Sequence, residues 1–277
     1  MHLFHAEWHK TLGNRRAAFG LLWLVPLVFV SFAIVGMVSM AVLRIFFADT
    51  AWLASIQGTT PISLEQQVDS SIFWLQILGS LVIQTLFISF AAISVAGEYH
   101  HATWKLIVPH AHRRDLLLAK IIVLLSVTYL ALLGTILVDI LTSYGPWTPL
   151  FGDILTNPSI IVMHLSEYVA ALLILLGKST LYVLYAVFGV VLTRSLLGGV
   201  LGAFGAIFFE AQVVSRVLPF LQPVMPVSSL EHSLRPLMAQ QEHTLGLSPL
   251  LSAATFAAWC VALVGSTLYR FMYQDLN

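Results

Sequence analysis

Long apolar runs separated by short polar stretches organise the whole chain. Six of these runs are about 20 residues or longer, which is the length of helix that crosses a bilayer. We expect the spans at residues 18–42, 71–96, 116–141, 167–192, 196–218 and 248–269. The pattern predicts an all-α integral membrane protein with six transmembrane helices, in a single transmembrane domain over residues 1–277.

The composition supports membrane insertion. Hydrophobic residues make up 58% of the 277 residues and charged residues only 9%, whereas a soluble domain carries roughly 25% charged residues. The net charge is zero, which gives no indication of a nucleic-acid partner. The single cysteine, Cys260, excludes an intramolecular disulfide framework. The first apolar run is too long for the core of a cleavable signal peptide, so we expect it to remain in the protein.

Residues 1–17 precede the first span and have the pattern of an amphipathic helix. Phe4, Trp8 and Leu12 recur every four residues and share one helical face, while basic and other polar residues fill the rest. Such a helix lies in the membrane interface, in contact with lipid. We therefore expect an interfacial helix at the N-terminus.

Lysine and arginine are divided unequally between the two sides of the predicted bundle. One side holds Lys10, Arg15, Arg16, Lys105, Arg113, Arg114, Lys120, Arg194 and Arg270. The other holds Arg44, Arg216 and Arg235. Because loops rich in these residues stay in the cytoplasm, both termini are expected there. Residues 219–247 are then an extracytoplasmic segment, in which Leu230, Leu234 and Leu237 predict a short amphipathic helix.

The most informative polar stretch covers residues 98–114, between the second and third spans. Tyr99, Trp104, Leu106 and Ile107 offer an apolar surface with charged edges. An element of this kind can press into a groove on a cytoplasmic partner. The alternative is an ordinary cytoplasmic loop that is basic only because of its orientation.

The run from Gly97 to Lys120, GEYHHATWKLIVPHAHRRDLLLAK, resembles the signature of the type-2 ABC transporter permease family. In that family a Glu ends the second span, and a Gly-Thr pair, a leucine-rich step, a Pro, a Ser-Arg pair and a Lys follow. The matching positions here are Glu98, Thr103, Leu106, Pro109, Arg113 and Lys120. Ala102 stands in place of the Gly, and His112 in place of the Ser. The layout of the whole chain is also similar to that of the family.

This resemblance implies a non-catalytic permease subunit of an ABC exporter. Residues 98–114 would serve as the coupling loop that docks on a separate ATPase subunit, with Glu98, Thr103, Trp104, Leu106, Pro109 and Arg113 as the contact residues. ATP and Mg²⁺ would bind to that partner, and a second permease copy or a paralogue would complete the channel. Separate permease and ATPase chains indicate a multi-pass protein of a prokaryotic inner membrane. The substrate cannot be read from these spans.

Two patterns suggest other chemistry. The string GKST at 177–180 lacks the glycine that a phosphate-binding loop requires at position 172 and lies in an apolar run, so we expect no nucleotide, and no other cofactor, on this chain. His100, His101, His110 and His112 share one loop, but their spacing matches no recurrent zinc pattern. Histidines on a docking surface are the alternative to a metal site, and we assign no catalytic or metal-binding residue.

Among the polar residues of the apolar runs, Gln84, Lys178 and Glu210 lie deep inside their predicted spans. Lys178 lies 16 residues before Arg194 and Glu210 lies 16 residues after it, so both are about 24 Å from the turn between spans four and five. An unpaired charge at such depth costs roughly 2.5 kcal/mol or more. Either Lys178 and Glu210 pair directly, or each faces water separately.

Two other classes of function stay open at this point. An ion-driven secondary transporter would need a charged path, for which Lys178 and Glu210 are the candidates, and commonly shows internal repeats. A polytopic membrane enzyme would use the clustered histidines. No internal repeat is visible in the sequence.

Overall fold

The computed structural model describes residues 5–9, 31, 72–100, 112–143, 158–237 and 248–274, and their regular elements are helices. The long helices are α5 (Leu81–His100), α7 (Arg113–Ser143), α9 (Pro158–Thr193), α10 (Leu196–Phe208) and α13 (Pro249–Met272). Between α10 and α13 lie short elements: η2 (Phe209–Val214), α11 (Ser215–Val217), η3 (Pro219–Val224), α12 (Pro226–Leu234) and η4 (Arg235–Leu237). Residues 5–9 and 72–78 are helical as well.

Five helical stretches in the described part of the chain are long and apolar enough to cross a membrane: Leu81–His100, Arg113–Val138, Leu165–Thr193, Leu196–Val217 and Pro249–Met272. They overlap the second to sixth predicted spans; of the first predicted span, residues 18–42, only Ser31 is among the described residues. Large apolar side chains point outward, with Val82 80% and Leu250 83% exposed. An exposed apolar surface of this extent is typical of a lipid-facing bundle.

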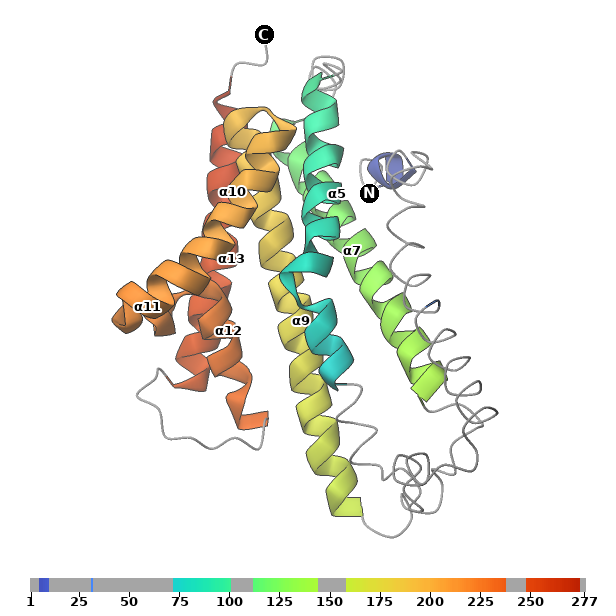
Figure 1. Ribbon diagram of the computed structural model, residues 1–277. Coiled ribbons are helices and arrows are strands. Elements are labelled where there is room, and N and C mark those ends of the chain that lie inside the picture. The colour runs from blue at the N-terminus through green and yellow to red at the C-terminus, as the bar shows by residue number, and fades with distance from the viewer. Residues whose placement is uncertain are drawn as a thin grey trace, which may run out of the picture.

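Helix α9 is the centre of the bundle, with α5, α7, α10 and α13 packed around it (Figure 1). The core joins buried side chains from separate helices, among them Phe87, Leu124, Val187 and Phe271. Each of these helices buries one stripe of its surface and leaves the rest exposed. Each helix is therefore held by packing along its inner face, and its outer apolar face is exposed, as expected for contact with lipid.

The turn from α9 to α10 is tight, as the sequence predicts. Arg194 has a φ of 57°, in the left-handed region, and Ser195 follows as the N-cap of α10, accepting a hydrogen bond from the Gly198 amide at 3.0 Å. A Cβ atom on Gly199 would collide with Val190, so the glycine allows the two helices to approach closely. The small residues near this turn are thus used for packing within the chain.

The second predicted span is not one continuous helix. It breaks at Gly79–Ser80, between residues 72–78 and α5. The side chain of Gln84, which is fully buried, donates to the Leu78 carbonyl at 2.8 Å. A free carbonyl inside an apolar bundle needs such a partner. Gln84 therefore satisfies the backbone at a helix break.

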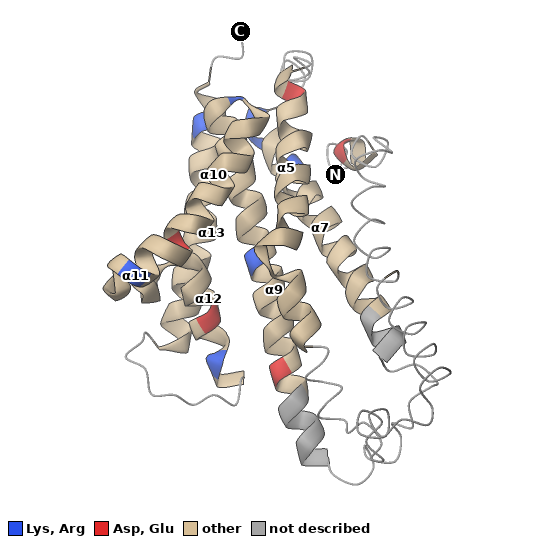
Figure 2. Cartoon of the chain, viewed as in Figure 1, with Lys and Arg blue, Asp and Glu red and all other residues tan. Residues whose placement is uncertain are grey.

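The basic residues gather at one end of the bundle (Figure 2). Arg113 opens α7, Arg194 follows α9 and Arg270 is in the last turn of α13. We call this the basic end, which also holds the end of α5, the start of α10 and residues 272–274. Arg216 and Arg235 lie away from it, in the segment between α10 and α13 (Figure 2). The division of charges expected from the sequence is thus present within the described residues.

The chain leaves the line of α10 at η2, a π-helical turn, and returns through α11 and η3 to α12 (Figure 1). The predicted helix around Leu230 is present, although it begins at Pro226. Leu230 is buried and lies so close to Gly177 of α9 that a Cβ there would overlap it. Trp259 of α13 donates its indole N–H to the Val224 carbonyl at 2.8 Å. Helix α12 therefore packs against α9 and α13, which the sequence pattern does not predict.

Candidate functional site

Four of the six predicted coupling residues, Thr103, Trp104, Leu106 and Pro109, lie outside the described residues. The other two flank this stretch: Glu98 is in the last turn of α5, and Arg113 is the first residue of α7. The geometry of the candidate site is therefore that of the two stems from which residues 101–111 extend. Both stems are at the basic end.

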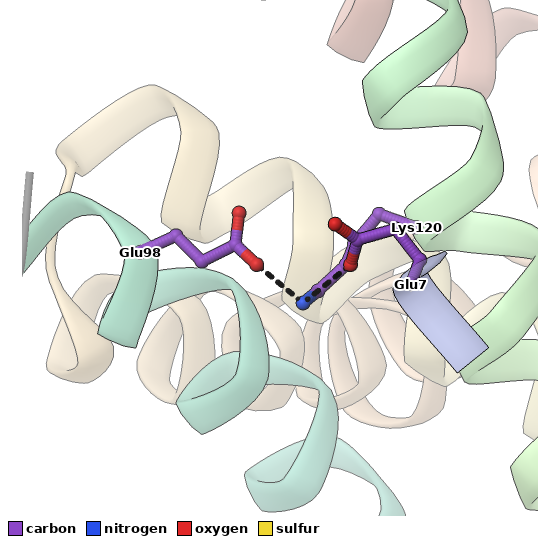
Figure 3. Close-up of polar contacts among 3 residues, drawn as sticks. All are labelled: Glu7, Glu98 and Lys120. Atoms are coloured by element: carbon purple, nitrogen blue, oxygen red, sulfur yellow. Dashed lines mark hydrogen bonds and ion pairs between the residues drawn. The ribbon is translucent and has the colours of Figure 1, made fainter. Parts of the chain in front are cut away.

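A buried lysine joins the two stems to the N-terminal segment. Lys120 Nζ lies 2.6 Å from Glu98 Oε1 and 3.3 Å from Glu7 Oε2, and the lysine is only 3% exposed (Figure 3). Glu98 comes from α5, Lys120 from α7 and Glu7 from the helical residues 5–9. Because Glu7 and Glu98 are buried too, each charge depends on its partners to offset the loss of hydration.

Glu7 is a functional candidate that the sequence did not single out. It lies outside the apolar face predicted from Phe4, Trp8 and Leu12, but it is buried in the bundle, and its neighbour Trp8 packs on the core. Exposed His5 and His9 occupy another side of the same turn, with ring centroids 6.4 Å apart. The N-terminal segment is thus fastened to the bundle by a charge as well as by apolar contact.

Arg113 serves a contact within the chain. Its guanidinium donates from one nitrogen to the carbonyls of Met272, at 3.2 Å, and Gln274, at 2.9 Å. These carbonyls lie at the end of α13, where cations are favoured by the helix dipole. Only the remaining donors of the fork are left for a partner protein.

Tyr99 completes the attachment from the other stem. Its hydroxyl donates to Gln274 Oε1 at 3.1 Å, and Gln274 Nε2 donates to the Val191 carbonyl at 3.3 Å. The two stems of the loop are therefore bound to residues near both ends of the sequence, through Lys120 and Glu7 on one side and through Gln274 on the other.

Of the two arrangements left open by the sequence, the direct pair of Lys178 and Glu210 is not the one that the structure has. Lys178 Nζ instead lies 2.7 Å from Glu231 Oε1, on α12. Glu210 Oε1 accepts from the backbone amides of Val227, at 2.8 Å, and Ser228, at 3.1 Å, also on α12. Helix α12 thus provides a partner to each of the two side chains.

Glu210 acts as the N-terminal cap of α12 from another helix. Met225, at the cap position, has no side-chain capping bond, and Pro226 at the first helical position has no N–H. The next two amides would lack acceptors without the Glu210 carboxylate. Glu210 is only 9% exposed, so water contributes little to the stabilisation of its carboxylate. The two amides and the positive end of the helix dipole take over this role.

The ion pair of Lys178 with Glu231 is more accessible than the other contacts. The Glu231 side chain is 47% exposed and that of Lys178 22%. Burial first, and Arg235 second, lower the pKa of the neighbouring His232, against an opposite effect of Glu231. The lowered pKa favours the neutral form of His232, and Lys178 is the cation that contacts Glu231.

Exchanging charges should identify this pairing. The double variant Lys178→Glu with Glu231→Lys should have a free energy of unfolding within about 1 kcal/mol of that of the native protein, because a partly exposed ion pair can form with its two charges exchanged. Lys178→Glu with Glu210→Lys should be much less stable, since a lysine cannot accept from the Val227 and Ser228 amides. Thermal unfolding in detergent micelles measures both. Equal stability of the two exchanged proteins would contradict the assignment.

Within the described residues, no group of three or more His, Cys, Asp or Glu side chains is arranged to hold a metal ion; His101 and His110 lie outside them. The chain matches no protein-family model, no curated protein and no solved structure. The description of the candidate site therefore depends only on the contacts within this chain.

Proposed function

We propose that this chain is the permease subunit of an ABC exporter. It has six membrane spans and both termini in the cytoplasm, and it lies in the plasma membrane of a prokaryote. A second permease copy or a paralogue completes the channel. A separate ATPase subunit docks on residues 98–114 and supplies the energy of ATP hydrolysis.

The observation that supports this proposal most is the firm attachment of the loop's two stems. A loop that transmits movement from a partner to the helices must be connected rigidly to them at both of its ends. Glu98 and Lys120 hold α5 to α7 at 2.6 Å, and Tyr99 and Arg113 hold both to the end of α13. The contact of Glu98 with Lys120 is buried and charge-assisted, and contacts of this kind are stronger than ordinary surface contacts. An unattached surface loop would not need them.

Charge and sequence support the same proposal. The basic end is the one from which residues 101–111 extend, and membrane proteins keep their Lys- and Arg-rich ends in the cytoplasm. The sequence contains no complete phosphate-binding loop, because position 172, five residues before the Gly-Lys pair of GKST, is Leu. A transporter of this design draws its energy from a partner.

Co-isolation with an ATPase tests the proposal directly. We expect an ABC ATPase encoded beside this chain to co-purify with the tagged protein in detergent. Trp104→Ala should lower the recovered ATPase by roughly thirtyfold, because a central aromatic contact contributes about 2 kcal/mol or more. The matched control is Tyr273→Ala, which removes a 75% exposed aromatic ring at the same end. Absence of any ATPase, or equal loss in both variants, refutes the docking surface.

The side of the membrane is tested separately. After Cys260→Ala removes the only thiol, Thr103→Cys provides a unique site in the loop. A membrane-impermeant maleimide should label it in inverted vesicles and not in intact cells. Labelling from the outside of intact cells would exclude the coupling role.

Ion-driven transport is less well supported. Such a mechanism needs a carboxylate that can exchange its ion or proton during each cycle. Glu210 is committed to capping α12, and Lys178 is paired with Glu231. Both contacts hold the fold together in the state described.

A further inference from the structure

Gln274 lies at a junction of four helices. It is two residues beyond the end of α13 and is only 3% exposed. Its side chain accepts from the Tyr99 hydroxyl of α5 and donates to the Val191 carbonyl of α9. Its own carbonyl accepts from Arg113 of α7 at 2.9 Å. One buried amide residue thus joins both stems of the loop to α9 and α13.

The end of α13 next to this junction is the part of the helix that is buried most. The buried residues of α13 are concentrated toward its end at Met272, where Leu263, Thr267, Leu268 and Phe271 lie, whereas its first half buries Ser252 and packs beside α12. The outer surface of the helix is exposed, with Val261 71% exposed. The end of α13 at Met272 is thus held both by the core and by the Gln274 junction, so a movement of the junction acts on that end of the helix.

We infer that Gln274 is a positioning residue that passes movement of the 98–114 loop to α13. The inference rests on the proposed function, in which a docked ATPase moves the loop. A displacement of either stem acts on Gln274 through Tyr99 or Arg113, and Gln274 lies only two residues from the last turn of α13. The helix that borders α12 and α9 is then shifted together with the loop.

The local part of this inference is measured without any partner. Gln274→Ala should speed amide hydrogen exchange about tenfold at the end of α5 and over the last turn of α13, because buried polar groups lose their partners. Gln274→Glu keeps an acceptor for Tyr99 and loses the donor to Val191, so the end of α5 should stay protected. Tyr273→Ala, one residue away and exposed, should leave both regions unchanged. Unchanged exchange in Gln274→Ala would overturn the junction.

The transmission of movement from the loop through Gln274 to α13, which we call the relay, is measured by the reactivity of Cys260, the only cysteine of the chain. This half-buried thiol of α13 is 14 residues from Gln274, or about 21 Å along the helix. N-ethylmaleimide, a small reagent, reports its accessibility in the purified complex. Addition of a non-hydrolysable ATP analogue to the complex should change the alkylation rate about fivefold or more. Gln274→Ala removes the contacts with Tyr99 and Val191 and keeps the backbone carbonyl that Arg113 contacts, so it should reduce this change at least twofold while the ATPase still co-purifies. Tyr273→Ala should retain the full change.

The outcomes separate the relay from the proposed function. If no ATPase binds to the native chain, the proposed function fails and the relay fails with it, whatever the exchange data show. If the ATPase binds and Gln274→Ala responds to the nucleotide as the native chain does, the relay alone is refuted. A native complex in which Cys260 never responds refutes it as well. A purely structural role for Gln274 would alter exchange but leave the nucleotide response in place.

Discussion

Replacing Lys120 with methionine should lower the free energy of unfolding by about 3–5 kcal/mol. The change keeps the length of the side chain and removes the ammonium that separates Glu98 from Glu7 (Figure 3). Two buried carboxylates would then face each other without a cation, and the N-terminal segment would lose its charged attachment. We expect faster proteolysis near residues 5–9 and a lower midpoint of thermal unfolding in detergent.

Two further variants make this result specific. Arg114→Met removes an exposed cation from the same helix and should change stability by less than about 0.5 kcal/mol. Adding Glu98→Gln and Glu7→Gln to Lys120→Met removes all three charges and should restore most of the lost stability, because apolar or neutral replacements of a complete buried ion group are often tolerated. A Lys120→Met protein as stable as the Arg114→Met control would show that the buried contact contributes nothing.

Replacing Glu210 with leucine should release α12 and cost about 2–4 kcal/mol. Leucine has a similar volume but cannot accept from the Val227 and Ser228 amides, which have no other acceptor at the start of that helix. The amides of α12 should then exchange faster with solvent deuterium, while α5 and α7 remain protected. Hydrogen exchange resolved by segment, with thermal unfolding, measures both effects.

The nature of the capping contact is tested by a milder change. Glu210→Gln keeps an acceptor oxygen and loses the charge, so it should cost about 1 kcal/mol. Glu231→Ala removes a more exposed carboxylate of α12 and should cost about 1 kcal/mol or less. If Glu210→Leu resembles Glu231→Ala, α12 is held by its apolar contacts with Gly177 and α13 and the cap is dispensable.

The helices of this protein were predictable because lipid imposes a simple requirement on sequence. A segment that crosses a bilayer must be apolar along its length and must satisfy its own backbone. The ends of α9, of α13 and of the stretch Leu196–Val217 that begins with α10 accordingly fall within a few residues of the predicted spans, apart from an early start of α9 at Pro158. The Arg194–Ser195 turn was visible as the only polar interruption between two apolar runs.

The partners of the polar residues were not predictable in the same way. Helix geometry placed Lys178 and Glu210 at the same depth, but a distance along an axis says nothing about what lies between two helices. Helix α12 provides a partner to each of them, and Glu210 caps it while Leu230 fits against Gly177. The contact of Glu7 with Lys120 spans 113 positions in the sequence. Contacts of such separation depend on the tertiary fold and leave no local pattern.

The π-helical turn at Phe209–Val214 has a geometric consequence for everything that follows it. A turn of this kind accommodates one residue more than an α-helical turn, and each residue of an α-helix advances by roughly 100° around the axis. The extra residue therefore changes, by about a quarter of a circle, the azimuth at which the chain departs from α10 toward Pro219. The direction in which α11, η3 and α12 leave the axis of α10 therefore depends on the number of residues in this turn, which includes Glu210.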